Sequence, residues 1–192
     1  MNGTQDPLPR SYWTAPPECL VDPGPPRMLA PPGAETVVAM VGSGTVPPNL
    51  FRRGPAGVIV VNSTPYLIDA GEGVFRGLIR VATSHDGLLA DAVLPTKMTR
   101  LFLSHLHSDH TVGLPSLMLL PWCYQRVDPL EVHGAIGVER LVTGLMEAYH
   151  GDLDQRLHGP EAKHLNATGW QMVAHEIAEP GPVYKDDNIE VE

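Results

Sequence analysis

Alternating apolar and polar positions mark the chain from residue 35 onward. The segment Thr36–Val41 predicts a strand, and Gly42–Pro48 predicts the loop that follows it. Gly57–Asn62 and Tyr66–Asp69 predict the two strands of a hairpin whose turn falls on Ser63–Pro65. The patterned part of the chain is therefore expected to begin with β-structure.

Helical periodicity appears three times further along the chain. The predicted helices are Gly73–Val81, Thr111–Leu120 and Ile136–Tyr149. In the first, Val74, Leu78 and Val81 have the spacing of one buried face; in the second, Pro115 is tolerated because it lies near the first turn. The third has an apolar side made of Val138, Leu141, Val142, Leu145 and Met146.

Short apolar runs between these helices predict further strands, at Arg100–Ser104, Leu130–His133, Trp170–Ile177 and Asn188–Val191. Residues 82–97 are expected to form a loop with a short helix, and His150–Gly169 to be polar and irregular. The order β, β, β, α, β, α, β, α, β, β predicts an α/β fold, a mixed sheet with helices packed on it.

Proline sets the beginning of the chain apart. Nine prolines fall within residues 1–33, which cannot hold regular helix or sheet, so an extended arm or a disordered tail is expected there. Residues 34–192 are expected to form one domain. No apolar stretch reaches the length of a membrane span, and no signal peptide is visible, which favours a cytoplasmic protein without excluding a secreted one.

Charge and cysteine content narrow the function classes. The net charge of −9 argues against a broad basic surface for nucleic acid, and the adjacent pair Arg52–Arg53 is interpreted as a solvated loop. The only cysteines, Cys19 and Cys123, exclude a disulfide scaffold, and Cys123 is expected to be a small buried apolar residue.

The densest chemistry lies in the hexapeptide His105–His110, which holds three imidazoles and a carboxylate where a strand runs into a helix. Imidazole nitrogen and carboxylate oxygen are ligands that zinc prefers. Side chains two apart in an extended stretch face the same way, so His105 and His107 can bind one ion. Asp109 and His110 point elsewhere and can meet a second ion. Neighbouring histidines without a metal are the less favoured alternative, because burying them unpaired is costly.

His-x-His-x-Asp-His after a strand resembles the signature of the metallo-β-lactamase fold hydrolases. Two upstream motifs, residues 37–45 and 66–73, resemble those of the ribonuclease Z-like and arylsulfatase-like branch. The resemblance implies the N-terminal half of an αββα fold, with helices outside a mixed sheet. The ligands that such a site takes from later in the family's sequence have no match here, so the chain is expected to be truncated at its C-terminal end.

The resemblance also implies roles for individual residues. Two Zn²⁺ ions per complete site would be held by His105, His107, Asp109 and His110, with Asp109 also orienting the attacking water. Asp69 would support the metal site from behind, or else be an ordinary turn aspartate. Gly42, Ser43, Gly44 and Thr45 would form a loop beside the substrate, or else a tight turn after the strand.

The function expected on these grounds is zinc-dependent hydrolysis by a metal-bound hydroxide. A small ester or phosphodiester substrate is favoured over RNA because the chain is acidic, with transfer RNA 3′-end processing as the alternative. A non-catalytic metal-binding or interaction module and a metal-dependent oxidoreductase are further alternatives. A homodimer follows from the resemblance alone. The remaining histidines are expected to be surface residues or satisfied polar groups: His85, His133, His150, His158, His164 and His175.

Overall fold

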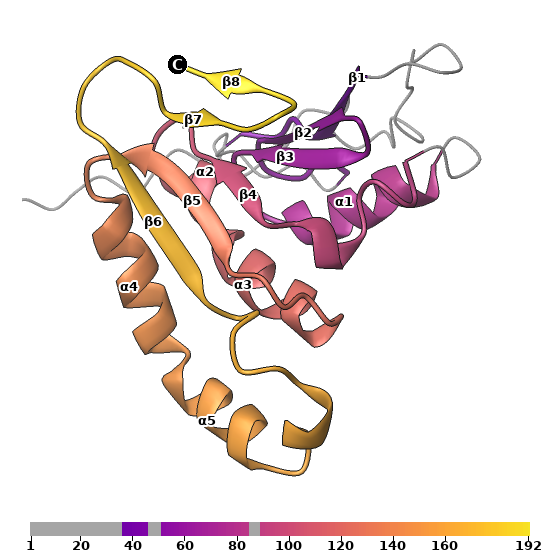
Figure 1. Ribbon diagram of the computed structural model, residues 1–192, viewed down its shortest axis with the longest axis vertical. Helices are drawn as coiled ribbons and strands as arrows, with labels where there is room; N and C mark the ends of the chain where they lie inside the picture. Colours follow the sequence, from indigo (N-terminus) through magenta and orange to yellow (C-terminus); the bar gives the residue numbers. More distant parts are fainter. Residues whose placement is uncertain (1–35, 46–50, 85–88) are drawn as a thin grey trace, which may run out of the picture.

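The computed structural model describes residues 36–45, 51–84 and 89–192, and Figure 1 shows them as one twisted sheet flanked by helices and a short hairpin. The proline-rich arm predicted over residues 1–33 lies outside the described residues. The six strands of the sheet lie side by side in sequence order: β1 (Thr36–Gly42), β2 (Ala56–Val61), β3 (Thr64–Ile68), β4 (Arg100–Phe102), β5 (Leu130–Ala135) and β6 (Met172–Ile177).

Strand direction changes within the sheet. The first three strands pair antiparallel, and β3 to β6 pair parallel. The β2–β3 hairpin turns on Asn62 and Ser63, whose φ angles of 48° and 64° are both left-handed. Such a two-residue turn matches the twist of the flanking strands. The predicted turn at residues 63–65 was therefore placed too late, and Thr64 and Pro65 belong to β3.

Helices cover one face of the sheet. The main ones are α1 (Val74–Thr83), α3 (Leu114–Cys123) and α4 (Val138–Ala148). Their buried side chains join one core with the inward side chains of the sheet, such as Val58, Leu67 and Leu101. The predicted buried face of α1 and the predicted apolar side of α4 both pack on this core. The mixed α/β class expected from the sequence is confirmed.

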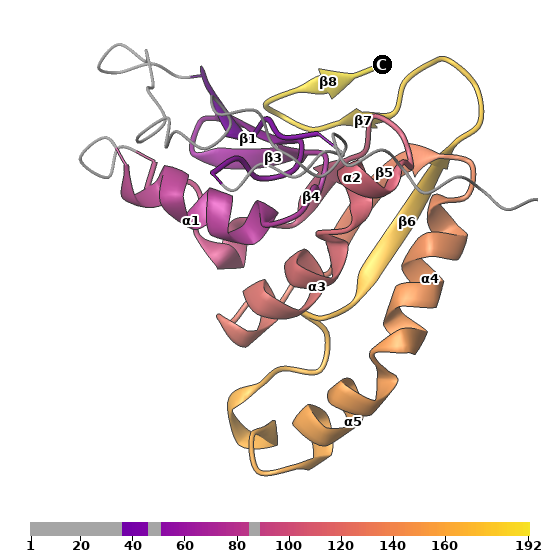
Figure 2. The same ribbon diagram turned by 180° about the vertical axis from the view of Figure 1, so that it is seen from behind.

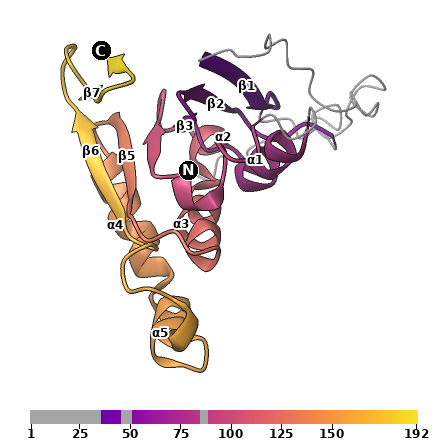
Figure 3. The same ribbon diagram turned by 45° about the vertical axis from the view of Figure 1, so that its right-hand side comes forward.

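The opposite face of the sheet carries a second, smaller sheet. Its strands are β7 (Tyr184–Lys185) and β8 (Glu190–Val191), which pair antiparallel. Figures 2 and 3 show this hairpin on the side of the main sheet away from the helices. Tyr184 packs edge-on against Tyr66 and Phe102, with ring centroids 6.3 and 5.6 Å away. The chain thus folds back across the sheet at its C-terminal end.

Two helices depart from the sequence-based expectation. Residues 108–111 form a short helix, α2 (Ser108–Thr111), so half of the histidine motif is helical rather than a junction. The stretch expected to be irregular contains α5 (His150–His158), followed by short 3₁₀ turns at Ala162–His164. Arg156 pairs with Asp152 one turn earlier at 3.0 Å, and such pairs support a helix whose apolar pattern is weak. A further 3₁₀ turn, Pro95–Lys97, precedes β4.

One arginine is fully buried beneath the parallel strands. The Arg126 guanidinium donates to the carbonyls of Met98, Leu117, Met118 and Gly169 at 2.7–3.0 Å. Burial lowers its pKa to about 10. The side chain therefore ties the end of α3 to the segment before β6, a role that no sequence pattern indicated. None of the helices in the described part of the chain combines the length and apolar character needed to span a bilayer.

Candidate metal centre

Asp69 follows β3 with its backbone in the left-handed region, at φ 58°. Its N–H donates to the carbonyl of Phe102 at 2.9 Å, so β3 stays paired with β4 up to the turn. Aspartate tolerates this conformation better than most residues. The residue is only 8% exposed, so the carboxylate faces the protein at the carboxyl end of β4.

The Asp69 carboxylate collects donors from the histidine motif. It accepts the Ser104 N–H at 2.8 Å, lies 2.9 Å from the Ser104 Oγ, and is 2.9 Å from His110 Nδ1. Because an ionised carboxylate only accepts hydrogen bonds, the His110 ring donates from Nδ1 and keeps its lone pair on Nε2. A histidine held in this way is oriented to bind a metal through the other nitrogen.

The three imidazoles of the motif form one cluster. The His105 ring centroid lies 4.6 Å from that of His107 and 4.1 Å from that of His110. His105 and His107 thus meet, as their alternation in an extended stretch predicted. His110 was expected to point elsewhere, yet its ring lies nearest to His105, because α2 begins at Ser108 and turns the chain back over Asp69.

Asp109 completes the candidate donor set from the first turn of α2. Its Oδ2 lies 3.6 Å from His110 Nε2, the nitrogen that faces away from Asp69. Three imidazoles and a carboxylate fit the ligand preference of zinc. Within residues 36–45, 51–84 and 89–192, however, no three His, Cys, Asp or Glu side chains already meet in the geometry of a metal site. The donors are gathered, but they do not by themselves form a closed site.

Close backbone contact fixes α2 against the β3 end. Ala70 N–H donates to the His110 carbonyl at 2.7 Å, and Gly113 N–H donates to the Ala70 carbonyl at 2.8 Å. A Cβ on Gly71 would come within 2.7 Å of the Asp109 carbonyl and closer still to Gly54. Only glycine lets these segments approach so closely. The glycine after Asp69 is thus what brings the metal motif onto the carboxylate.

The glycines of the 42–45 loop are explained by packing. Gly44 N–H donates to the Arg53 carbonyl at 2.7 Å, and a Cβ on Gly42 would strike the Gly54 carbonyl. This contact with residues 53–54 accounts for both glycines without a substrate. Ser43 and Thr45 are exposed. A place for this loop beside the substrate stays a prediction.

His133 differs from the expectation that it is a surface residue or a polar residue with hydrogen-bond partners. It is 5% exposed, and neither ring nitrogen has a hydrogen-bond partner among the residues that the structure describes. The ring is stacked between Phe102 and His175, with centroids 4.8 and 4.5 Å away. Burial and the neighbouring His175 lower the pKa of His133 to about 4. The residue was missed because its position in a short strand carries no sign of which face is covered.

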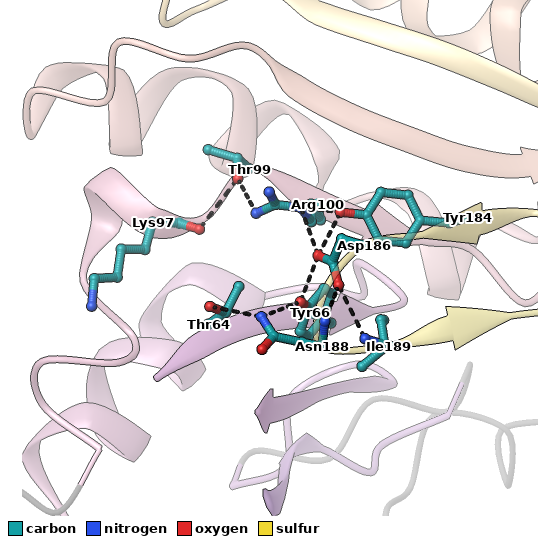
Figure 4. Close-up of polar contacts among 9 residues, drawn as sticks. All are labelled: Thr64, Tyr66, Lys97, Thr99, Arg100, Tyr184, Asp186, Asn188 and Ile189. Atoms are coloured by element: carbon teal, nitrogen blue, oxygen red, sulfur yellow. Dashed lines mark hydrogen bonds and ion pairs between the residues drawn. The ribbon is translucent and has the colours of Figure 1, made fainter. Parts of the chain in front are cut away.

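A separate polar cluster lies on the face of the main sheet that carries the β7–β8 hairpin (Figure 4). Asp186, in the β7–β8 turn, accepts the hydroxyls of Tyr66 at 2.7 Å and Tyr184 at 2.8 Å. It also accepts the backbone N–H groups of Asn188 and Ile189 at 2.8 and 3.0 Å. Burial opposes ionisation of Asp186, but these hydrogen bonds outweigh it and lower its pKa to about 2. The cluster fastens the C-terminal hairpin to β3.

The fold and the donor set indicate a metal-dependent protein, and comparison with known families identifies its class. The profile of the Metallo-beta-lactamase superfamily matches residues 50–179, and the chain belongs to this superfamily. Its members are generally metal-dependent, typically with zinc. The resemblance inferred from the three motifs is therefore confirmed, and so is the class expected for the enzyme, a metal-dependent hydrolase, at the level of the superfamily.

Individual relatives narrow the comparison. Ribonuclease Z from Mycobacterium sp. (strain KMS) is 29% identical over 152 residues, which cover 78% of this chain and 48% of the relative. Ribonuclease Z from Lactococcus lactis subsp. cremoris (strain SK11) is 32% identical over 130 residues, 66% of this chain and 34% of the relative. The chain thus spans half or less of the length of these relatives.

Among solved structures, the short form of human tRNase Z is similar in fold, with a TM-score of 0.52 at 24% identity over 74% of this chain and 45% of that one. These relatives overturn one expectation. A small ester or phosphodiester substrate was favoured over RNA because the chain is acidic, and this preference was wrong, since the relatives found are ribonucleases Z. Net charge averages over the whole surface and says little about one site.

Proposed function

We propose that the protein is a metal-dependent endoribonuclease of the ribonuclease Z kind, and that the histidine motif of this chain is the metal-binding part of its active site. The observation that carries the proposal is the cluster of His105, His107 and His110, with His110 held by Asp69 through Nδ1. The ribonuclease Z relatives support RNA as the substrate. Processing of a transfer RNA 3′ end is the form of this activity that they favour.

Each residue of the cluster has a role in this proposal. His105 and His107 would hold one zinc ion, and Asp109 and His110 a second. Bound zinc would supply an activated water and polarise the scissile phosphodiester. Asp69 keeps His110 in the tautomer whose Nε2 is free to bind metal, as its 2.9 Å contact with Nδ1 indicates. Asp109 would also orient the water.

Two arginines beside the start of α1, Arg53 and Arg76, support an anionic substrate despite the net charge of −9. The Arg53 methylenes run along α1, where a Cβ on Gly73 would meet them at 3.2 Å. Arg76 is exposed on the same stripe of this helix, three residues from Gly73. None of the ion pairs found between described residues involves Arg53 or Arg76. The backbone of residues 54–55, which directly follow Arg53, contacts Gly71, and Gly71 in turn contacts Asp109.

The test is cleavage and binding of a transfer RNA precursor by the 192-residue chain, with zinc per chain measured by elemental analysis. The proposal expects bound zinc, specific cleavage at the 3′ end, and affinity that falls with salt because phosphates are contacted. His107→Ala should abolish cleavage. His175→Ala is the matched control, because it removes an exposed imidazole that pairs with Glu131 away from the histidine motif. This variant should retain cleavage.

A second candidate is a metal-binding module without catalysis. One observation favours it: among the described side chains, no three His, Cys, Asp or Glu residues meet as a closed metal site. Zinc binding without RNA cleavage or salt-dependent RNA binding would support the module. Failure to bind zinc at all would sink both candidates.

A further inference from the structure

Ser104 lies at the centre of the hydrogen bonds around the metal motif, although it is not one of the proposed ligands. Its Oγ is 2.9 Å from each oxygen of the Asp69 carboxylate, 3.1 Å from His105 Nδ1 and 3.4 Å from His110 Nδ1. Its backbone N–H donates to the same carboxylate at 2.8 Å. A serine that only ended a strand would need none of these side-chain contacts.

The direction of these hydrogen bonds follows from their donors and acceptors. A hydroxyl has one hydrogen, and a carboxylate is a stronger acceptor than a neutral imidazole, so the Ser104 Oγ–H donates to Asp69. The Ser104 oxygen is then left as an acceptor for the His105 Nδ1–H at 3.1 Å. His110 donates directly to Asp69, since its Nδ1 lies closer to the carboxylate, at 2.9 Å, than to the hydroxyl.

We propose that Ser104 is a positioning residue that extends the influence of Asp69 from His110 to His105. The relay from Asp69 through the Ser104 hydroxyl to His105 Nδ1 places the lone pair of His105 on Nε2. This inference rests on the proposed function, because it concerns imidazoles that hold metal. One buried carboxylate thereby sets the tautomer of two of the three rings, one directly and one through the hydroxyl.

The Ser104 hydroxyl is the contact that sets the tautomer of His105. In the segments that the structure describes, no other hydrogen bond to His105 Nδ1 is found. Without the Ser104 oxygen, His105 would populate both tautomers, and only one of them presents Nε2 to a metal. Partners of this kind typically change metal affinity about 10–100-fold.

The experiment compares three variants of the whole chain by zinc titration against a competing chelator. Ser104→Ala should weaken zinc binding about 10–100-fold, whereas Ser104→Thr, which keeps the hydroxyl, should restore wild-type affinity. Ser116→Ala is the matched control. It also removes a hydroxyl, one that donates to the Gly113 carbonyl at 2.7 Å, but it touches no imidazole and should bind zinc as the wild type does.

A second measurement reads the tautomer without metal. In ¹⁵N-correlated spectra of the zinc-free wild type, His105 should carry its proton on Nδ1, and Ser104→Ala should shift it toward Nε2. Wild-type affinity together with an unchanged tautomer in Ser104→Ala would overturn the inference, as would an Nε2–H tautomer in the wild type, which needs no variant to fold. If the wild type binds no zinc, the proposed function fails, while the tautomer still tests Ser104.

Discussion

Two hydrogen-bonded carboxylates organise this molecule, the buried Asp69 and the partly buried Asp186, and they differ in whether their donors keep an atom free to bind a ligand. Asp69 gathers Ser104 and His110, and the imidazole keeps a second nitrogen that faces away from the carboxylate. Asp186 gathers the hydroxyls of Tyr66 and Tyr184 and two backbone N–H groups, which have no such second atom. One cluster is left open for a ligand, and the other is closed.

The comparison shows that burial and hydrogen bonding of a carboxylate do not indicate function by themselves. Both aspartates directly follow a strand, and both accept several hydrogen bonds at 2.7–3.0 Å. The chemistry of the donors decides, because an imidazole held through one nitrogen presents its far nitrogen to a ligand. The two phenol oxygens of the Asp186 cluster are instead already occupied, since Tyr66 accepts from Asn188 and Tyr184 accepts from Arg100. The open cluster is accordingly the candidate metal centre, and the closed one fixes the hairpin.

The largest difference is expected in metal affinity. Asp69→Asn keeps a residue that tolerates the left-handed backbone but removes the charge that holds the His110 proton. It should weaken zinc binding about 10–100-fold, measured by chelator competition. Asp186→Asn should leave zinc affinity unchanged. Equal losses in both variants would contradict the distinction between the clusters.

Stability should respond to the closed cluster. Asp186→Asn leaves at least one of the two phenolic hydroxyls or backbone N–H groups with a weaker acceptor, so it should lower the free energy of unfolding by about 1–3 kcal/mol. Urea denaturation followed by tyrosine and tryptophan fluorescence measures the loss. A variant as stable as the wild type would mean that the hairpin does not depend on Asp186.

Acid should lower the free energy of unfolding in two steps, through His133 and Asp186 on the sheet face that carries the β7–β8 hairpin. The pKa of His133 is lowered from 6.5 to about 4, so the unfolded chain takes up its proton first, and stability falls as the pH drops from 6.5 toward 4. The pKa of Asp186 is lowered from 3.8 to about 2, so its contribution is present above 3.8 and is lost as the pH falls toward 2. Unfolding free energies measured against pH should lose the upper step in His133→Phe and the lower step in Asp186→Asn.

The smallest effect is expected from a single hydroxyl. Tyr66→Phe removes one donor to Asp186 and keeps the ring contact with Tyr184, so it should cost about 1 kcal/mol of unfolding free energy. Burial and Asp186 raise the pKa of Tyr66 to about 12. An ultraviolet titration should therefore lose, in this variant, the tyrosine that ionises last. If all tyrosines titrate near pH 10 in the wild type, the cluster is not closed.

Periodicity in the sequence predicted most of the sheet and the main helices. The buried positions Val74, Leu78 and Val81 of α1 follow directly from it, because a helix must bury an apolar stripe. Periodicity did not predict helix α5 around Arg156, because this helix is supported by ion pairs along its surface rather than by an apolar pattern. Arg126 was also missed, because its four carbonyl partners come from segments far apart in sequence.

The sequence by itself determined the family and the donor set. Three imidazoles and a carboxylate within six residues are a local feature, so reading the chain is enough to find them. Only the tertiary structure decided that His110 lies beside His105, that Ser104 links Asp69 to His105, and that His133 is covered by the C-terminal hairpin. Asp69 and Ser104 follow different strands, and Tyr184, which covers His133, belongs to the C-terminal hairpin. The position of His110 depends on the close approach of Gly71 to α2, which periodicity does not encode.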